Sequence, residues 1–289
     1  MCSAGRSILL LLIAFGAAGA TSAQTLEGMR SEVREKKERP SRAADSKRQS
    51  SCDDEEDSGW VVQALAEQPI VQNLAGVAAM GAVVGVTSPI WAPQKVLDDE
   101  GGPGYFPKYP YGKHGGSLLF DESRRGAHSS LLVLQGDYGS DFDSLSQAHV
   151  RFFGERDHRF GFDTEFFYRE EELRPGTDDL WHGDFNLTYR FAQNEHWQFR
   201  AGVGVNWLTD DLDTDFGFNA TYGVEWFPVK PWVLNSSLDW GRIGSTSLLH
   251  LRNTVGVTRS GWGVFTGHDY LRIGDDRINS FIVGLEYRF

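Results

Sequence analysis

Hydrophobic and polar residues alternate along the chain from residue 129 to its end. In 197–207, Trp197, Val203 and Trp207 lie on one face, and Arg200 and Asn206 lie on the other. A period of two is that of a β-strand. Ten such segments occur, at 129–138, 145–154, 159–170, 180–191, 196–208, 215–227, 231–240, 247–258, 261–273 and 278–289. Because the breaks between them are short and turn-like, we expect an all-β fold at 129–289, an antiparallel up-and-down barrel of about ten strands.

The region before the barrel divides into four segments by composition. Residues 1–23 carry Arg6, an apolar run and a small-residue end, which is typical of a cleaved signal peptide; a retained anchor helix is the alternative. Residues 24–59 are highly charged and are expected to be disordered; the alternative for 26–39 is a short helix, which would have no partner face. Residues 60–91 are apolar and predict a helix, and 92–128 form a linker rich in Gly, Pro and aromatic residues.

The apolar segment at 60–91 allows two interpretations. Its continuous apolar part, 74–86, falls short of the roughly 20 residues that span a bilayer. We therefore expect it to pack on, or insert into, the following domain. The alternative is a membrane-embedded helix that dimerises through Gly81 and Gly85, which have the spacing of a small-residue packing motif.

Large aromatic residues occur at both ends of the apolar face of single strands. Two rings on one strand are eight or ten residues apart, which is roughly 19–23 Å along the membrane normal for a tilted strand. Outer-membrane barrels carry aromatic girdles at both edges of an apolar band about 25 Å tall. The sequence therefore predicts a transmembrane barrel whose girdle includes Phe160, Tyr168, Trp181, Trp197, Trp207, Trp226, Trp232, Trp240, Trp262 and Tyr270.

The opposite face of the strands is charged. Burying unpaired ions between two soluble sheets would cost several kcal/mol each, whereas charges of both signs can pair inside a narrow lumen. We expect a lumen lined by Asp163, Glu165, Arg190, Arg200, Glu225, Asp239, Arg252 and Glu286. In the alternative, a secreted soluble β-sandwich or barrel that acts as a binding protein, these charges would face water.

The last strand carries a more specific signal. Phe281, Val283, Leu285, Tyr287 and Phe289 alternate with polar residues up to the final position. This segment resembles the C-terminal signal strand of Gram-negative outer-membrane β-barrel proteins. The resemblance implies a location in the outer membrane, contact with its lipid, and insertion by the barrel-assembly machinery. It also implies a periplasmic C-terminus, with the loops near 139–144, 171–179, 209–214, 241–246 and 274–277 on the outside.

Composition excludes several other classes of protein. A net charge of −12 argues against a nucleic-acid partner, and a mean hydropathy of −0.37 argues against a helical membrane bundle. The spacing of Asp211, Asp213 and Asp215 resembles a calcium loop but lacks the required Gly and Glu, so we expect no metal and no cofactor. A Ser-His-acid site formed by Ser237, His250 and Asp239 is geometrically conceivable, but no motif supports it and we expect no enzyme.

A barrel of about ten strands has a lumen that side chains can nearly fill. The function we expect is a small outer-membrane barrel with a narrow, charge-lined lumen and a structural or interaction role. The alternatives are a porin-like channel for small solutes, an outer-membrane barrel hydrolase, and the secreted soluble binding protein. The sequence leaves the oligomeric state open.

Overall fold

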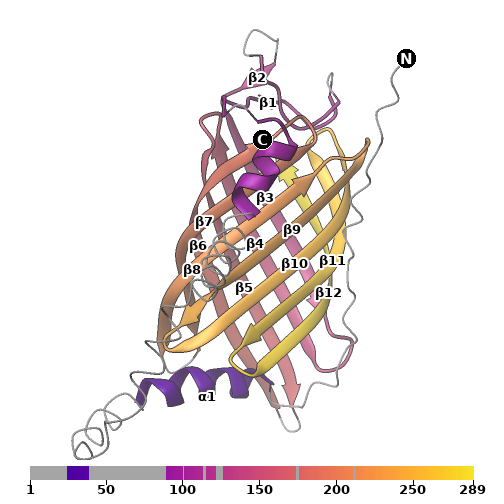
Figure 1. Cartoon of the computed structure of the whole chain (residues 1–289). Coiled ribbons are helices and arrows are strands. Elements are labelled where there is room, and N and C mark those ends of the chain that lie inside the picture. The colour runs from indigo at the N-terminus through magenta and orange to yellow at the C-terminus, as the bar shows by residue number, and fades with distance from the viewer. Residues whose placement is uncertain are drawn as a thin grey trace, which may run out of the picture.

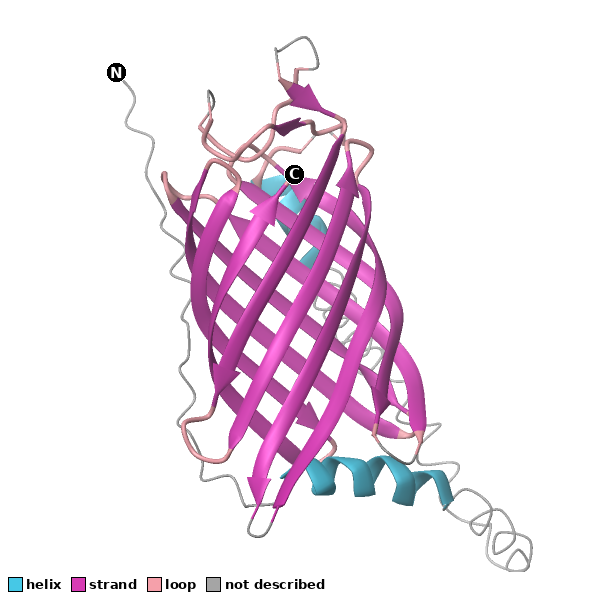
Figure 2. Cartoon of the chain, turned by 180° about the vertical axis from the view of Figure 1, so that it is seen from behind, coloured by secondary structure: helices cyan, strands magenta, loops and turns pink. Residues whose placement is uncertain are grey.

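The computed structural model describes residues 25–38, 89–99, 101–112, 115–121, 126–173, 176–210 and 213–289. Ten strands form a closed barrel, drawn in Figures 1 and 2. Each strand pairs antiparallel with its neighbours, and the last closes on the first through pairs such as Phe281 with Ser140. The strands are β3 (Ser130–Ser140), β4 (Leu145–Arg156), β5 (Phe160–Leu173), β6 (Gly176–Gln193), β7 (Trp197–Thr209), β8 (Thr214–Trp226), β9 (Trp232–Ile243), β10 (Thr246–Arg259), β11 (Trp262–Ile273) and β12 (Asp276–Arg288).

The prediction of an antiparallel barrel of about ten strands is therefore confirmed. All ten segments identified from the alternation are strands, with ends that differ from the prediction by a few residues. The largest difference is at β6, which begins at Gly176 rather than at 180. Its other end carries a β-bulge between Arg190 and Ala192, where the alternation of faces breaks.

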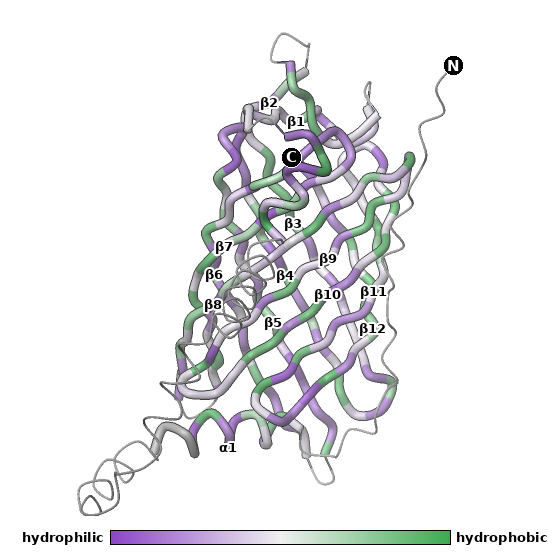
Figure 3. Tube along the Cα trace, viewed as in Figure 1, coloured by the Kyte–Doolittle hydropathy of each residue, from purple (hydrophilic) through white to green (hydrophobic). Residues whose placement is uncertain are grey.

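The barrel is apolar outside and polar inside. Outward side chains such as Leu187, Val203 and Leu285 expose more than half of their surface, whereas Arg169 and Arg190 in the lumen expose none. Figure 3 shows the resulting alternation of hydropathy along the strands. A soluble barrel would bury its large apolar residues instead. The arrangement is that of a transmembrane barrel, as predicted.

Glycines allow neighbouring strands to approach closely in the wall formed by β6–β9. A Cβ atom on Gly204 would lie 1.9 Å from the carbonyl oxygen of Phe185, and one on Gly217 would lie 1.6 Å from that of Arg242. No side chain fits at such distances, so these positions require glycine. They let the sheet curve tightly enough to enclose a narrow lumen.

A helix closes one end of the barrel. Helix α1 (Thr25–Glu38) lies across the end at which β12 begins (Figure 1). The prediction that 24–59 is disordered is wrong for these residues. Leu26, Met29 and Val33 recur at helical spacing and are fully buried. Their partners are inward-facing apolar residues at the strand ends, here named the apolar ring: Leu145, Leu180, Leu208, Ile243, Leu248, Leu271, Ile273 and Ile278.

The segment that precedes the barrel folds at the other end, near Phe289. A helix at 89–96 is followed by β1 (Phe106–Pro107), which pairs with β2 (Ala127–His128), and by a bridge between Tyr105 and Leu119. The predicted linker at 92–128 thus contains short regular elements, because its buried Phe106, Leu118 and Leu119 give it something to pack. The signal peptide at 1–23 and most of the apolar segment, at 60–88, lie outside the described residues. Among the helices that are described, none has the length and apolar character needed to cross a membrane.

Candidate functional site

The lumen is the candidate site, because it gathers the charged side chains. All eight predicted lumen residues point inward. Seven are buried, and Asp163 is partly exposed beside Arg151, which donates two hydrogen bonds to it.

The half of the lumen nearer to α1 holds an ionic cluster centred on Asp269. The guanidinium groups of Arg169 and Arg252 donate to its two carboxylate oxygens at 2.9 and 3.0 Å. The His250 ring nitrogen Nε2 lies 3.0 Å from the second of these oxygens. Arg252 also pairs with Asp137. These residues come from β3, β5, β10 and β11, so the cluster ties together strands on different sides of the barrel.

The half nearer to Phe289 holds a second cluster. Glu155 accepts hydrogen bonds from Arg190 and Arg200, each at 3.1 Å. Arg288 pairs with Glu225 and, at 2.8 Å, with Glu286. These contacts again connect distant strands, because Glu155 is on β4 and Arg200 on β7, and Glu225 is on β8 and Arg288 on β12.

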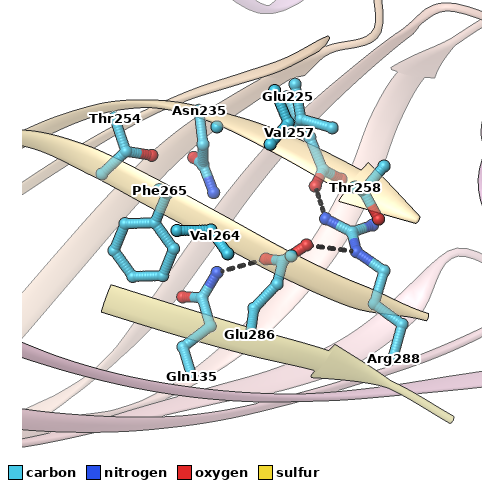
Figure 4. A pocket seen from close by; sticks show the side chains of 13 residues that line it. Gln135, Glu225, Asn235, Thr254, Val257, Thr258, Val264, Phe265, Glu286 and Arg288 are labelled. Atoms are coloured by element: carbon cyan, nitrogen blue, oxygen red, sulfur yellow. Dashed lines mark hydrogen bonds and ion pairs between the residues drawn. The ribbon is translucent and has the colours of Figure 1, made fainter. Parts of the chain in front are cut away.

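A small cavity lies beside this second cluster (Figure 4). Its volume is about 20 Å³, which accommodates one water molecule. Gln135, whose amide donates to Glu286 at 2.8 Å, and Phe265 lie on its wall. The cavity is too small for a solute or a substrate.

Between the clusters, two carboxylates are connected by amides rather than by cations. Asn186 donates to Asp184 at 2.9 Å, and Asn219 donates to Asn186 and to Asp239 at 3.1 Å each. Within the part of the chain that the structure describes, neither Asp184 nor Asp239 has an ion-pair partner. Asp239 is therefore the one predicted lumen charge that the structure places outside a salt bridge.

The lumen histidines make contacts other than those of the Ser-His-acid arrangement considered from the sequence. His250 is aligned with Asp239 in the register of β9 and β10, but its ring bonds to Asp269 instead. The Ser237–His250–Asp239 arrangement considered from the sequence is therefore not assembled. His149 and His182 stack on the ring of Phe167, at centroid distances of 4.2 and 4.6 Å. No group of three or more residues suited to hold a metal ion occurs within the described ranges, and Asp211 lies outside them.

Helix α1 is fastened to the barrel by polar contacts as well as by its apolar face. The carboxylate of Glu171 accepts hydrogen bonds from the backbone amides of Thr25 and Leu26, at 3.1 and 3.0 Å. These amides belong to the first turn of the helix and have no partner within it, so the carboxylate caps the helix. Arg30 pairs with Asp178, and Arg34 pairs with Asp210.

The segment at 99–119 fills the opposite end of the barrel. Arg159 donates to the carboxylate of Asp99 at 2.6 and 2.8 Å and to the carbonyl of Gly102. Burial by itself would raise the pKa of Asp99, but the hydrogen bonds and charge of Arg159 outweigh it and hold that pKa below its usual value. Phe106 lies under the guanidinium of Arg190, at 5.1 Å from its ring centroid. This end is therefore covered by packed, hydrogen-bonded chain.

Tyr111 completes this second closure. Its hydroxyl donates to the carbonyl of Trp232 at 2.6 Å, and its ring packs edge-on against Phe227. Burial, together with the negative charge of Glu225, raises the pKa of Tyr111 to about 12. The hydroxyl therefore keeps its proton and remains a donor at physiological pH.

The ten predicted girdle residues all face outward, five toward each end of the barrel. Rings from neighbouring strands touch: Tyr168 and Trp181 are 4.9 Å apart at the end near α1, and Trp197 and Trp226 are 4.7 Å apart at the other. The first group is Tyr168, Trp181, Trp207, Trp240 and Tyr270. The second is Phe160, Trp197, Trp226, Trp232 and Trp262.

The predicted C-terminal signal residues lie on the outside of β12. Phe281, Val283, Leu285 and Phe289 each expose about half of their surface or more, and Tyr287 packs against Trp262. Phe289 is joined to the first strand of the barrel, because its amide donates to the carbonyl of Leu132 at 2.9 Å. Recognition of this strand by an assembly machinery stays a prediction.

The sequence-based selection missed several partners of the lumen charges. They are Asp137, Glu155, Asp269 and Arg288, of which Asp137, Glu155 and Asp269 join the clusters from β3, β4 and β11. Alternation does place them on the inward face. Alternation does not indicate which arginine pairs with which carboxylate, since the paired residues are up to 115 positions apart in the chain.

Comparison with known proteins finds solved structures of low similarity to this chain. Three similar solved structures are the outer membrane protein Ail of Yersinia pestis, OprG of Pseudomonas aeruginosa and the KdgM porin. They share 12%, 13% and 10% sequence identity with this chain and have TM-scores of 0.33, 0.31 and 0.32. The alignments cover 55%, 56% and 55% of this chain and 99%, 96% and 99% of those proteins. No family model and no curated protein matches.

Similarities of this size carry no inference about activity. The architecture itself decides the class: ten antiparallel strands closed into a barrel, apolar outside and charged inside. This is the architecture of outer-membrane β-barrels, so the class predicted from the C-terminal strand is confirmed.

Proposed function

We propose that this protein is a closed outer-membrane barrel with a structural or interaction role, and that its lumen conducts no solutes. Ion pairs that cross the lumen carry the proposal. Arg169 reaches Asp269, and Arg288 reaches Glu225. Counted around the ring of ten strands, each of these pairs joins strands four places apart, where five would be diametrically opposite.

The energetics support a permanent closure. Removing one partner of a buried ion pair costs about 3–5 kcal/mol, because the remaining charge has no compensation. A path for solutes would require several such pairs to separate together. It would also require the displacement of α1 at one end and of the segment at 99–119 at the other.

Single-channel conductance tests the proposal most directly. The full chain is refolded into planar lipid bilayers, with a porin of known conductance as the control for insertion and sensitivity. We expect no conductance steps from this protein, although heat-modifiable gel mobility shows that the barrel is folded. Regular conductance steps would support the porin-like alternative and overturn the proposal.

A matched variant tests whether the ion pairs are the cause. In Arg169→Ala/Asp269→Ala, both ends of one cross-lumen contact are removed, and His250 and Arg252 lose one partner each. If these side chains are what fills the lumen, brief conductance steps are expected from the variant. The substitution of one outward residue, Leu187→Ala, serves as the control and should produce no conductance steps.

A further inference from the structure

A row of polar side chains lies in the middle of the lipid-facing wall. Ser236 on β9, Asn253 on β10 and His268 on β11 all point outward, and the register places Asn253 directly beside each of the other two. Ser236 Oγ lies 2.8 Å from Asn253 Oδ1. Asn253 is in the centre of β10, so the row is at the depth of the bilayer midplane. We call these three residues the polar row.

Lipid is an unfavourable neighbour for this row. Polar groups in hydrocarbon cost free energy unless they are hydrogen-bonded. Within the described residues, the ring of His268 has no hydrogen-bond partner. At the same depth on other strands the outward residues are apolar, as are Val150, Phe166 and Val203. The row therefore indicates that protein, rather than lipid, covers this part of the wall.

The burial of the surrounding side chains supports a cover. Tyr222, Leu238 and Leu251 face outward around the row and are half-buried. Leu187 and Val203, on the adjoining wall of β6 and β7, expose 62% and 57% of their surface. Thr266 and Tyr270, which flank His268 on β11, are half-buried as well, whereas Phe216 and Phe218 on β8 expose 64% and 57%. The reduced exposure is therefore local to the surroundings of the row.

The path of the chain identifies the cover. Helix α1 ends at residue 38 at one end of the barrel, and the described chain resumes at 89 on the outer wall toward the other end (Figure 1). There the hydroxyl of Tyr222 donates to the carbonyl of Pro89 at 2.9 Å, and the amide of Gln94 donates to the carbonyl of Phe191 at 2.7 Å. Cross-lumen ion pairs and packed segments close the interior, which leaves the outer wall as the surface available to a connection between 38 and 89.

The helix at 89–96 gives the direction of that connection. Its first residue, Pro89, contacts Tyr222, several residues inside the end of β8, whereas Gln94 contacts Phe191, close to the end of β6. The chain therefore enters this helix from the middle of the wall and runs toward the rim. Tyr222, which Pro89 contacts, is aligned with Leu238, two residues from Ser236 of the polar row.

We propose that residues 60–88 cross the bilayer against the outer wall of β8–β11 and cover the polar row. The sequence of this segment fits the position. Residues 74–86 are continuously apolar, and Gly81 and Gly85 allow a close approach to the wall. Gln72 and Asn73 add amides that can pair with polar groups. Its 29 residues reach across a bilayer core of about 30 Å even in a helix, which rises 1.5 Å per residue.

Site-specific photo-crosslinking in the native outer membrane tests this. The photoreactive residue p-benzoylphenylalanine replaces Asn253 in one variant of the full chain and Ser236 in a second, so that failure of one to fold leaves the other. The control replaces Phe166 on β5, which faces lipid on the opposite side of the barrel. Heat-modifiable mobility selects folded protein before illumination.

The expected result is an intramolecular crosslink from 253 and 236 to a peptide within 60–88, identified by mass spectrometry, and none from 166. A crosslinked dimer would show that a second copy covers the row. Adducts with lipid alone from all three positions would show that the wall is bare. Either of these outcomes overturns the proposal, and neither changes the conductance on which the proposed function depends.

Discussion

An arginine introduced in the middle of the lipid-facing wall measures how the barrel is oriented in the membrane. Val203 is the central residue of β7, faces outward and exposes 57% of its surface. For Val203→Arg we expect a loss of about 2–4 kcal/mol in the free energy of unfolding, the cost of arginine at the midplane. The same exchange at Val257 is the matched control. Val257 also faces outward but is aligned with Trp232 in the girdle, where the cost falls to about 0–1 kcal/mol.

Refolding into phospholipid vesicles, followed by denaturant titration with tryptophan fluorescence, gives both values. A third variant, Asn219→Arg, places the charge in the lumen, beside the carboxylate of Asp239. It should show no lipid penalty, although it alters the packing of the lumen. Equal losses for Val203→Arg and Val257→Arg would contradict the assigned depth. A larger loss for Asn219→Arg than for Val203→Arg would mean that the polar face, not the apolar one, meets the lipid.

Three further predictions concern the two ends of the barrel. Deletion of Phe289 should lower the amount of protein assembled in the outer membrane several-fold while leaving refolding in detergent nearly unchanged; equal accumulation would argue against a signal strand. Met29→Ala should weaken the docking of α1 by roughly 2–5 kcal/mol, seen as faster trypsin cleavage within α1, and Ser31→Ala on its exposed side should not. Since the pKa of Asp99 is lowered in the folded state, its bond to Arg159 stabilises the segment at 99–104 above pH 4 and is lost as the pH falls below that. The protection of the amides of Asp99, Gly101, Gly102 and Gly104 against hydrogen exchange, relative to the intrinsic rate at each pH, should therefore fall on acidification in the natural chain, and Asp99→Asn should abolish this pH dependence.

The strands were predictable because their signal is local. Side chains of a strand alternate between two faces, so the residues of β7 and β12 could be assigned to strands from the sequence alone. The aromatic residues at both ends of the apolar face then distinguished an outward from an inward apolar surface. Each of these inferences depends on residues within one strand and needs no knowledge of its neighbours.

The docking of helix α1 could not be anticipated, because its partner surface exists only after the barrel has closed. The sequence of the helix is strongly charged, and the three buried apolar residues described in it are too few to stabilise a helix alone. The apolar ring that receives Leu26, Met29 and Val33 comes from seven different strands. In the sequence each strand contributes only one or two of these ring residues, at its end, and nothing distinguishes them from the other inward-facing positions.

The charge pairs of the lumen were likewise decided by the tertiary structure. Arg190, Arg200 and Glu225 occupy polar positions of the alternation, and their side chains lie inside the barrel as expected from the sequence. Which carboxylate each arginine meets depends on the number of strands, their register and the tight curvature that glycines such as Gly204 permit. Alternation along a strand therefore determines which side chains point into the lumen. The closure of the sheet determines which of them form ion pairs, because the partners lie on strands that are far apart in the chain.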